Sequence, residues 1–547
     1  MSTATSRNRR LHTMRGTNLW ELLCQRASAS PDATFVEWHP YGDHPARSWT
    51  YREFLRDASS LGAGLQARGV RRGEKVLIHL ENSPEFLLSW FGCVAIGAVA
   101  VTTNTRSAKD ELAYYADDCG AVAAITQPAF VDLVAAAAPR LSWAVTTSHD
   151  SGDPVHDGDP ANESHVESLF TDPDSLEAAP SDISSPLSVQ YTSGTTSRPK
   201  GVLWTHGNGL WAARINAVHE ALRPDDCHLA YMPLFHTNAL AYSFLASLYV
   251  GARVVVVPKW STSRFADLSV AHGCTWLSLI GISGRTIAEG GLPDGHRYRM
   301  FGGAICDPPF ATAAGIKMIG WWGMTETLTH GIVGDPYTPN RSMAIGRPAP
   351  EYEIAVVRAD GTPVDDEETG NLLIRGVQGV SLFAEYLNQP DSTAAAFDDD
   401  GWFSTGDLVT PHADGYLTFA DRSKDMLKVG GENVAASEVE RVAAMVPGVT
   451  EVAVVAGSDP ALDEIPIAFV IGAASELDTA VRDACADQLA DFKVPRRVIV
   501  VDEMPRSTLG KVNKAELRRT LQADEDLTEA QLRWRAESAA DPSGNAG

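Results

Sequence analysis

Residues 191–201, with the sequence YTSGTTSRPKG, gather hydroxyls, glycines and two cations directly after the largely apolar residues 187–190. A strand that runs into such a loop presents backbone N–H groups, side-chain hydroxyls and the Lys200 ammonium to one point, which is what a polyphosphate needs. The GxxxxGK[ST] spacing of a Walker loop is absent, because Lys200 is followed by Gly201. A solvated linker is the alternative interpretation, but the Arg-Pro-Lys-Gly run behind the hydroxyls favours a phosphate loop.

Two glycine-containing motifs follow further along the chain. Residues 302–304 (GGA) come after the short apolar pair at 300–301, and adjacent glycines let a flat ring such as adenine lie against the backbone. Taken alone, a plain turn would explain these glycines equally well. Residues 320–327 (GWWGMTET) follow a predicted strand at 316–319 and carry a hydroxyl and a carboxylate, which could also cap a helix.

A carboxylate lies within residues 401–408 (GWFSTGDL). A carboxylate can accept both hydrogens of a vicinal diol, so Asp407 is the predicted ribose ligand. By itself a Gly-Asp pair would be an ordinary turn.

These motifs stand in the order found in the AMP-forming acyl-adenylating enzymes (the ANL superfamily), which comprise acyl-CoA ligases, luciferases and peptide-synthetase adenylation domains. The chain resembles this family from about residue 20 to residue 521. It looks most like the carnitine/crotonobetaine-CoA ligase branch, on residues 329–335 (THGIVGD) and 430–434 (GGENV). The resemblance implies an ATP-dependent acid–thiol ligase. Such an enzyme joins a carboxylate to ATP to give acyl-AMP and pyrophosphate, and then transfers the acyl group to coenzyme A with release of AMP.

The resemblance also assigns roles to individual residues. It implies catalytic roles for Lys511, Thr195, Glu326 and His236, and an Mg²⁺ site at Thr195 and Glu326. It implies ATP or AMP binding by Thr192, Ser193, Gly194, Thr195, Thr196, Lys200, Gly302, Gly303, Ala304, Trp321, Trp322, Gly323, Met324, Thr325, Asp407, Arg422 and Lys511. It places the acyl group and coenzyme A near His236, Thr237, Asn238, Gly430, Gly431 and Glu432, and a hinge at Lys424. The expected cofactors are ATP, Mg²⁺ and coenzyme A.

The hydrophobic patterning indicates an α/β fold. Predicted strands at 76–80, 98–102 and 121–126 alternate with predicted helices at 84–96 and 108–118, which is the pattern of βαβ units and a parallel sheet. Residues 355–383 alternate as in an antiparallel β-subdomain, and the pattern beyond residue 421 is that of a compact α+β domain. We therefore expect three parts. These are a large adenylation domain of parallel-type sheets at 1–421, a small mobile lid domain at 422–525 and a flexible acidic tail at 526–547.

The amino-acid composition argues against some classes of binding partner. The net charge of −25 argues against a nucleic-acid or anionic-membrane surface. Seven scattered cysteines without a CxxC pair fit reduced thiols in a cytosolic protein. No apolar run is long enough to span a membrane, and the N-terminal arginines precede no apolar signal segment. We expect a cytoplasmic enzyme whose partners are a small carboxylate, ATP and coenzyme A, with a homodimer as one option for its assembly.

Two points stay open: which molecule accepts the acyl group, and which carboxylic acid is activated. An adenylating enzyme that passes its acyl group to a carrier protein, a luciferase-like oxygenase and a non-catalytic binding protein are the rival functions. An amino acid substrate is disfavoured, because residues 232–238 (MPLFHTN) lack the aspartate that peptide synthetases place there. Trp321 and Trp322 could offer π-faces to a quaternary ammonium or serve as apolar walls for an aliphatic, aromatic or steroid-like acid. Residues 278–283 and 304–319 depart from the family's pattern, so the length and polarity of the acid stay open.

Overall fold

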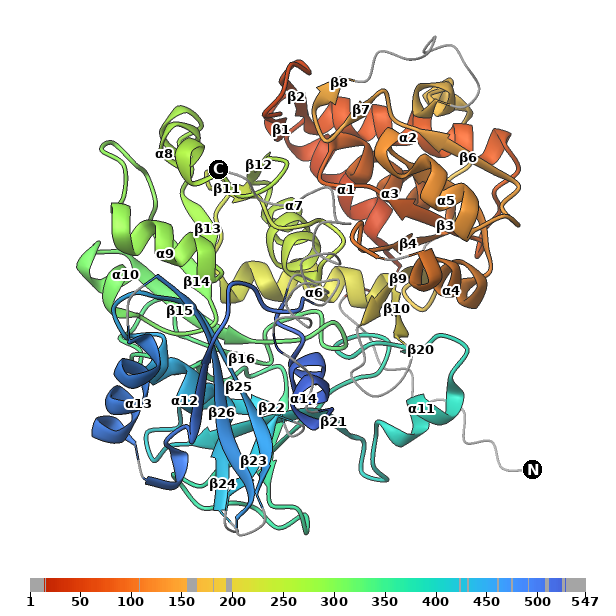
Figure 1. Ribbon diagram of the computed structural model, residues 1–547. Helices are drawn as coiled ribbons and strands as arrows, with labels where there is room; N and C mark the ends of the chain where they lie inside the picture. The colour runs from red at the N-terminus through yellow and green to blue at the C-terminus, as the bar shows by residue number, and fades with distance from the viewer. Residues whose placement is uncertain are drawn as a thin grey trace. The chain divides into compact units, whose positions relative to one another are not determined.

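The computed structural model describes residue 14 and residues 16–527, except 108, 155–164, 181, 193–198, 423–424, 430–431, 460–461, 474–475, 490, 507–510 and 524–526. The chain divides into two compact units, one of Met1–Ile354 with Ile374–Phe403 and one of Ala355–Leu373 with Ser404–Gly547 (Figure 1). Apart from Leu527, the predicted tail at 526–547 lies outside the described residues.

The first unit contains a seven-stranded sheet in the order β20-β10-β9-β4-β3-β5-β6. Its strands are β3 (Lys75–His79), β4 (Val99–Thr102), β5 (Ala121–Thr126), β6 (Trp143–Thr146), β9 (Pro186–Thr192), β10 (Lys200–Thr205) and β20 (Glu385–Tyr386). The run from β9 to β6 is parallel, whereas β10 and β20 pair antiparallel at one edge. The connecting helices are α3 (Pro84–Ile96) and α4 (Lys109–Cys119). The strands and helices predicted between residues 76 and 126 are all found, each within one residue of its expected bounds.

This unit also contains a nine-stranded sheet, in the order β17-β16-β15-β14-β13-β11-β12-β1-β2. Its strands are β1 (Thr34–Trp38), β2 (Arg47–Thr50), β11 (Cys227–Ala230), β12 (Arg253–Val256), β13 (Trp276–Ser278), β14 (Met300–Gly303), β15 (Lys317–Trp322), β16 (Ile332–Val333) and β17 (Arg347–Pro348). The run from β1 through β15 is parallel. The strand expected at 316–319 therefore continues to Trp322, so both tryptophans belong to the sheet and not to a loop.

Helices cover these two sheets. They are α1 (Leu19–Ala29), α2 (Tyr51–Ala67), α5 (Val131–Ala137), α6 (His206–His219), the π-helix η4 (Asn238–Leu245), α7 (Ala246–Val250), α8 (Thr262–Ala271), α9 (Gly281–Gly290), α10 (Pro309–Ala313) and α11 (Pro390–Ala395). Short elements are β7 (His149–Asp150), β8 (Asp153–Pro154), η1 (Pro128–Phe130), η2 (Val166–Leu169) and η3 (Pro173–Ser175). Thr50 caps α2 as expected, because its hydroxyl accepts from the N–H of Glu53 while the Glu53 carboxylate accepts from the N–H of Thr50.

The second unit carries a five-stranded sheet in the order β24-β23-β26-β25, with β27 beside β26. Its elements are β23 (Met426–Val429), β24 (Glu432–Ala435), β25 (Val449–Asp459), β26 (Asp463–Gly472), β27 (Arg497–Val500), α12 (Ala436–Ala443), α13 (Leu477–Gln488), η5 (Asp491–Lys493) and α14 (Lys514–Gln522). A four-stranded sheet of β18 (Glu353–Val357), β19 (Gly370–Arg375), β21 (Trp402–Pro411) and β22 (Leu417–Arg422) has residues in both units.

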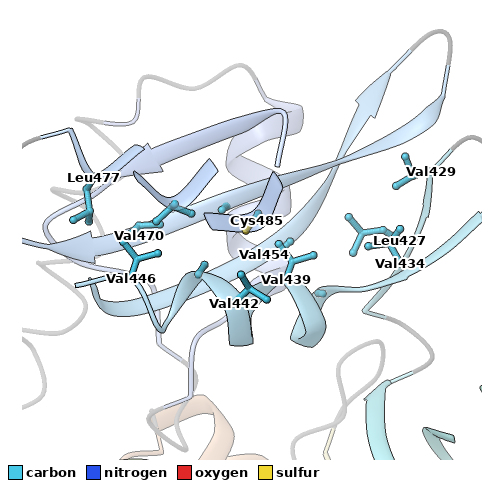
Figure 2. Close-up of a cluster of buried hydrophobic side chains, with 14 residues drawn as sticks. Leu427, Val429, Val434, Val439, Val442, Val446, Val454, Val470, Leu477 and Cys485 are labelled. Carbon is cyan, nitrogen blue, oxygen red and sulfur yellow. The ribbon is translucent and has the colours of Figure 1, made fainter. Parts of the chain in front are cut away.

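Side chains of the long strands β25 and β26 alternate between two apolar clusters, as strand geometry requires. Val454 and Val470 pack with α12 and α13 in the cluster that Figure 2 shows. Val455 and Phe469, one residue away on each strand, pack with Leu517 of α14 in the second cluster. A sheet with helices on both faces therefore forms the core of this unit.

The predicted α/β fold class is confirmed. All seven cysteines are free. Among the helices of the described ranges, none has the length and apolar character needed to span a bilayer.

Candidate active site

The predicted phosphate loop is anchored by two paired strands. β9 ends at Thr192 and β10 begins at Lys200, and these two residues lie opposite each other in the antiparallel register. The Thr192 hydroxyl donates to the carbonyl oxygen of Lys200 at 3.4 Å. A strand thus leads into the loop as the sequence predicts. The predicted ligands Ser193, Gly194, Thr195 and Thr196 lie outside the described residues.

One tyrosine links the loop lysine to the predicted metal-binding carboxylate. β20 pairs with β10 and sets Tyr386 opposite Val202. The Lys200 ammonium lies 4.3 Å from the centroid of the Tyr386 ring, a cation–π contact. The Tyr386 hydroxyl donates to Glu326 Oε1 at 2.9 Å. Lys200, Tyr386 and Glu326 therefore form one connected group, although no sequence motif pointed to Tyr386.

Burial keeps the Tyr386 hydroxyl in its protonated form. Tyr386 and Glu326 are each only 5% exposed. Burial, and then the neighbouring Glu326 carboxylate, raise the pKa of the Tyr386 hydroxyl well above its ordinary value. The hydroxyl thus stays protonated at neutral pH and keeps donating to Glu326.

Backbone contacts fix the turn that carries Glu326. The N–H of Phe383 donates to the carbonyl oxygen of Glu326 at 2.8 Å, and the Trp204 indole N–H donates to that of Thr325 at 2.9 Å. The N–H of Met324 donates to the Thr327 hydroxyl at 3.0 Å. Thr325, predicted to contact phosphate, and Met324 are half-buried at this turn.

The predicted adenine motif is part of the sheet. Gly302 and Gly303 end β14, and Ala304 follows as an exposed residue. A Cβ on Gly302 would lie 1.9 Å from Cζ3 of Trp321, and a Cβ on Gly303 would lie 2.4 Å from Cε of Met318. Contact with protein side chains thus already requires glycine at these two positions, and binding of adenine beside them stays a prediction.

Trp321 lies inside a stack of rings. Its ring is parallel to that of Trp276, with centroids 6.0 Å apart and planes 5° apart, and to that of His330, with centroids 4.4 Å apart and planes 14° apart. Trp321 therefore packs against two other rings and is 8% exposed, and its interpretation as a π-face for a quaternary ammonium or as an apolar wall stays a prediction. Trp322, the next residue of β15, is buried at 6% exposure, and Gly323 is half-buried at the start of the turn.

Replacing Gly302 with alanine is expected to lower the free energy of unfolding by about 1–3 kcal/mol, because the added methyl must displace the Trp321 ring. Urea unfolding of the single variant and of the double variant Gly302→Ala/Trp321→Ala measures this. The double variant should lose less than the two single losses combined, because the missing indole leaves room for the methyl. Additive losses would contradict the contact.

The predicted acyl motif is tied to the phosphate-loop strand. The Thr237 hydroxyl donates to Gln190 Oε1 at 2.9 Å, and Gln190 lies on β9 two residues before Thr192. The buried Gln190 Nε2 has no hydrogen-bond partner among the described residues. Asn238 begins η4, and His236 is half-buried just before it. Sequence reasoning missed Gln190, for which an amide side chain within a largely apolar strand was the available signal.

A second missed residue holds the start of this motif. Asn82 Nδ2 donates to the carbonyl oxygens of Met232 at 2.9 Å and Val257 at 3.1 Å, and Asn82 Oδ1 accepts from the N–H of Leu234 at 2.8 Å. One buried amide thus positions the segment that leads to His236.

In the second unit, the predicted ribose ligand Asp407 and the predicted nucleotide-binding residue Arg422 are brought together. Asp407 on β21 and Arg422 on β22 lie opposite each other in the antiparallel register. Asp407 is 4% exposed, and its N–H donates to the Thr405 hydroxyl at 3.1 Å. The Thr405 hydroxyl in turn donates to the carbonyl oxygen of Leu372 at 2.8 Å, which fixes the turn before Asp407.

Lys511 lies beside two backbone contacts in the same unit. Arg506 and Val512 form an antiparallel bridge, and the N–H of Asn513 donates to the carbonyl oxygen of Pro505 at 2.7 Å. Lys511, between these contacts, is exposed. Glu432 begins β24 opposite Val429. Lys424, Gly430 and Gly431 lie outside the described residues.

Among the described residues, the carboxylates match one common way in which proteins hold Mg²⁺. The described ranges hold no cluster of three or more His, Cys, Asp or Glu side chains that could cage a metal ion. Mg²⁺ is often held by one or two carboxylates together with substrate phosphates. A single buried carboxylate, Glu326, near a predicted phosphate loop matches that mode.

Two family models together match most of the chain. Residues 23–387 match the model of the AMP-binding enzyme family, and residues 438–511 match that of the AMP-binding enzyme C-terminal domain. The chain belongs to the AMP-binding enzyme family. Among its relatives, the crotonobetaine/carnitine–CoA ligase of Proteus mirabilis (strain HI4320) is 32% identical over 493 residues, which cover 86% of this chain and 93% of the relative.

Solved structures of CoA ligases and CoA synthetases have a similar fold. The anthranilate CoA ligase AuaEII in complex with anthranoyl-AMP has a TM-score of 0.81 at 28% identity, covering 93% of this chain and 98% of that one. The o-succinylbenzoate CoA synthetase (MenE) of Bacillus subtilis with ATP and magnesium ion has a TM-score of 0.78 at 25% identity, covering 92% and 99%.

The predicted activity and cofactors are confirmed by this membership. The chain is an AMP-forming acyl-CoA ligase that uses ATP, Mg²⁺ and coenzyme A. The alternatives of a carrier-protein acceptor and of a luciferase-like oxygenase are not favoured. The resemblance to the carnitine/crotonobetaine-CoA ligase branch is confirmed as well.

Proposed function

We propose that this ligase activates a small carboxylic acid at a site built on Lys200, Tyr386 and Glu326. The observation that carries this proposal is the Tyr386 side chain, whose ring faces the Lys200 ammonium and whose hydroxyl donates to Glu326. One residue thereby sets a cation and an anion at fixed positions beside the loop expected to hold the triphosphate. Preorganised charges of this kind stabilise the charge that develops as a phosphoryl bond breaks.

In the first half-reaction, a carboxylate oxygen of the acid attacks the α-phosphorus of ATP. The bond between the α-phosphorus and its bridging oxygen breaks, and pyrophosphate leaves with the electron pair. Mg²⁺ bound at Glu326 would neutralise phosphate charge. Lys200 holds the leaving phosphates, and Lys511 offsets the negative charge that builds up between the two anions. Positioning supplies much of the rate, because both reactants are anions that repel each other in water.

In the second half-reaction, the sulfur of coenzyme A attacks the acyl carbonyl as the thiol loses its proton to solvent, and AMP leaves with the electrons of the carbon–oxygen bond. We propose that residues 422–525 act as a lid that pivots at Lys424. Lys511 would withdraw, and Gly430, Gly431 and Glu432 would guide the thiol. Asp407 and Arg422 would hold the ribose, and Thr237, Asn238 and His236 would border the acyl group. Gating of this kind lets one site serve two reactions. Homodimer assembly and a cytoplasmic location stay predictions.

Replacing Tyr386 with phenylalanine tests the role of the Tyr386 side chain in this site. The variant keeps the ring beneath Lys200 but removes the donor to Glu326. We expect the Mg²⁺ concentration for half-maximal pyrophosphate release to rise about 10–100-fold, as for other residues that orient a metal ligand.

Tyr51→Phe is the matched control, because it removes another buried hydroxyl, bonded to the carbonyl oxygen of Ala252 at 2.8 Å and far from these residues in sequence. It should leave the Mg²⁺ dependence unchanged. An unaltered Mg²⁺ dependence in Tyr386→Phe would refute the proposed role of Tyr386.

A further inference from the structure

We propose, resting on the proposed function, that Tyr114 and Asp118 of α4 position the two strand ends that carry predicted nucleotide ligands. These ends are Thr192 of β9 and Lys200 of β10. Tyr114 and Asp118 act through the strands and do not touch the nucleotide themselves, so they are positioning residues. Neither residue belongs to a motif that pointed to the site in the sequence.

α4 is packed firmly against the seven-stranded sheet (Figure 1). Its buried residues Leu112, Tyr115 and Cys119 recur at helical spacing and belong to the same apolar cluster as Val189 of β9. The Tyr115 ring also stacks on that of Tyr191, with centroids 4.3 Å apart and planes 23° apart. Because protein interiors pack densely, α4 cannot shift without disturbing these contacts.

Asp118 holds the end of β9. The Tyr191 hydroxyl donates to Asp118 Oδ2 at 2.7 Å, and Tyr191 directly precedes Thr192. Burial, and then Cys119 and Asp118, raise the pKa of the Tyr191 hydroxyl well above its ordinary value, so it stays protonated and keeps donating at neutral pH. Gly201 lies opposite Tyr191 and leaves room for its ring, since a Cβ on Gly201 would lie 3.2 Å from Cζ of Tyr191. A hydrogen bond to a carboxylate is among the stronger kinds, so the residue before Thr192 is tied closely to α4.

Tyr114 holds the start of β10. Its hydroxyl donates to the carbonyl oxygen of Pro199 at 3.0 Å and accepts from Gln389 Nε2 at 3.5 Å. Pro199 directly precedes Lys200, and its ring fixes φ, so holding its carbonyl group sets the direction in which the chain enters β10. Tyr114 and Asp118 are four residues apart and therefore neighbours on one face of α4. One turn of α4 thus holds both strand ends.

The same turn of α4 contacts the segment that follows Tyr386. Asn388 Nδ2 donates to the carbonyl oxygen of Asp118 at 2.5 Å. Lys200 and Tyr386, whose ammonium and ring centroid lie 4.3 Å apart, are therefore each within two residues of a contact with α4. A shift of about 1 Å in the position of such a group can greatly reduce its effect on a bound substrate. Loss of a bond to α4 is thus expected to weaken the hold of Lys200 on the phosphates.

Replacing Tyr114 with phenylalanine, or Asp118 with alanine, tests the inference by calorimetric titration with MgATP and with AMP. Each variant loses the bond to one strand end and keeps the apolar face of α4. We expect the Kd of MgATP to rise about three- to ten-fold, the range for loss of one hydrogen bond. The Kd of AMP should change little, because AMP lacks the two phosphates that Lys200 is proposed to hold. Asp118→Asn, which can still accept from Tyr191, should bind MgATP nearly as tightly as the unaltered enzyme.

Tyr41→Phe is the matched control, because it removes a tyrosine hydroxyl that donates to another backbone carbonyl oxygen, that of Lys259, at 2.6 Å. It should leave both dissociation constants unchanged. The inference is overturned if MgATP binding is unaltered in both Tyr114→Phe and Asp118→Ala. Equal weakening of MgATP and AMP would also overturn it, by showing a general loss of structure. If the unaltered enzyme binds MgATP but releases no pyrophosphate with any of a broad panel of carboxylic acids, the proposed function fails, and the role of α4 is still decided by the two dissociation constants.

Discussion

Replacing Glu326 with glutamine is expected to slow pyrophosphate release by about a thousand-fold, since an amide cannot neutralise a divalent cation on the phosphates. Glu326 is the buried carboxylate of its turn, held by the Tyr386 hydroxyl and by the backbone of Phe383. Glutamine keeps the shape of the side chain, so the backbone contacts should survive. Pyrophosphate release at saturating ATP and acid, over a range of Mg²⁺ concentrations, measures the loss.

Glu385→Gln is the matched control. Glu385 is exposed and lies next to Tyr386 on β20, so the substitution removes a charge from the same strand without touching the Lys200–Tyr386–Glu326 group. Its rate should equal that of the unaltered enzyme. Near-normal pyrophosphate release by Glu326→Gln would show that the metal is held elsewhere.

Replacing Lys511 with alanine is expected to slow acyl-AMP formation by about a hundred-fold or more, because the loss removes the cation that would offset charge between the acid and the α-phosphate. Transfer from supplied acyl-AMP to coenzyme A should continue at nearly the normal rate, since Lys511 is proposed to be withdrawn in that step. The two half-reactions are measured separately, by pyrophosphate release and by thioester formation.

Lys514→Ala controls for the loss of a lysine from the same region. Lys514 begins α14, and its ammonium lies 2.8 Å from Glu440 Oε1, so its role is to join two elements of the second unit. Both half-reactions should be preserved in this variant. Equal losses in both half-reactions of Lys511→Ala would refute a role restricted to adenylation.

Local patterns were sufficient to predict much of the first unit. The alternation of apolar runs between residues 76 and 126 located three strands and two helices within one residue, because each element carries its own periodicity. The strand that leads into the phosphate loop was also visible, since hydroxyls and glycines interrupt an apolar run at Thr192. Such signals are encoded within a few neighbouring residues.

The contacts that organise the candidate site were not visible in the sequence. Tyr386 reaches Lys200 only because β20 pairs with β10, and nothing near residue 386 signals that pairing. The sequence predicted a strand only over residues 316–319. The strand nevertheless continues to Trp322, since large aromatic residues pack well on a sheet. The reason for glycine at 302 likewise depends on Trp321 of the neighbouring strand.

The proposed order of steps is tested most directly by identifying the products that form before and after coenzyme A is added. The enzyme is incubated with Mg²⁺, ATP and butyrate, first without and then with coenzyme A, and the nucleotides and acyl species are separated by chromatography. We predict bound butyryl-AMP and pyrophosphate before coenzyme A is added, and equal amounts of AMP and butyryl-CoA afterwards. Formation of ADP and inorganic phosphate, or of butyryl-CoA without prior acyl-AMP, would contradict the proposal.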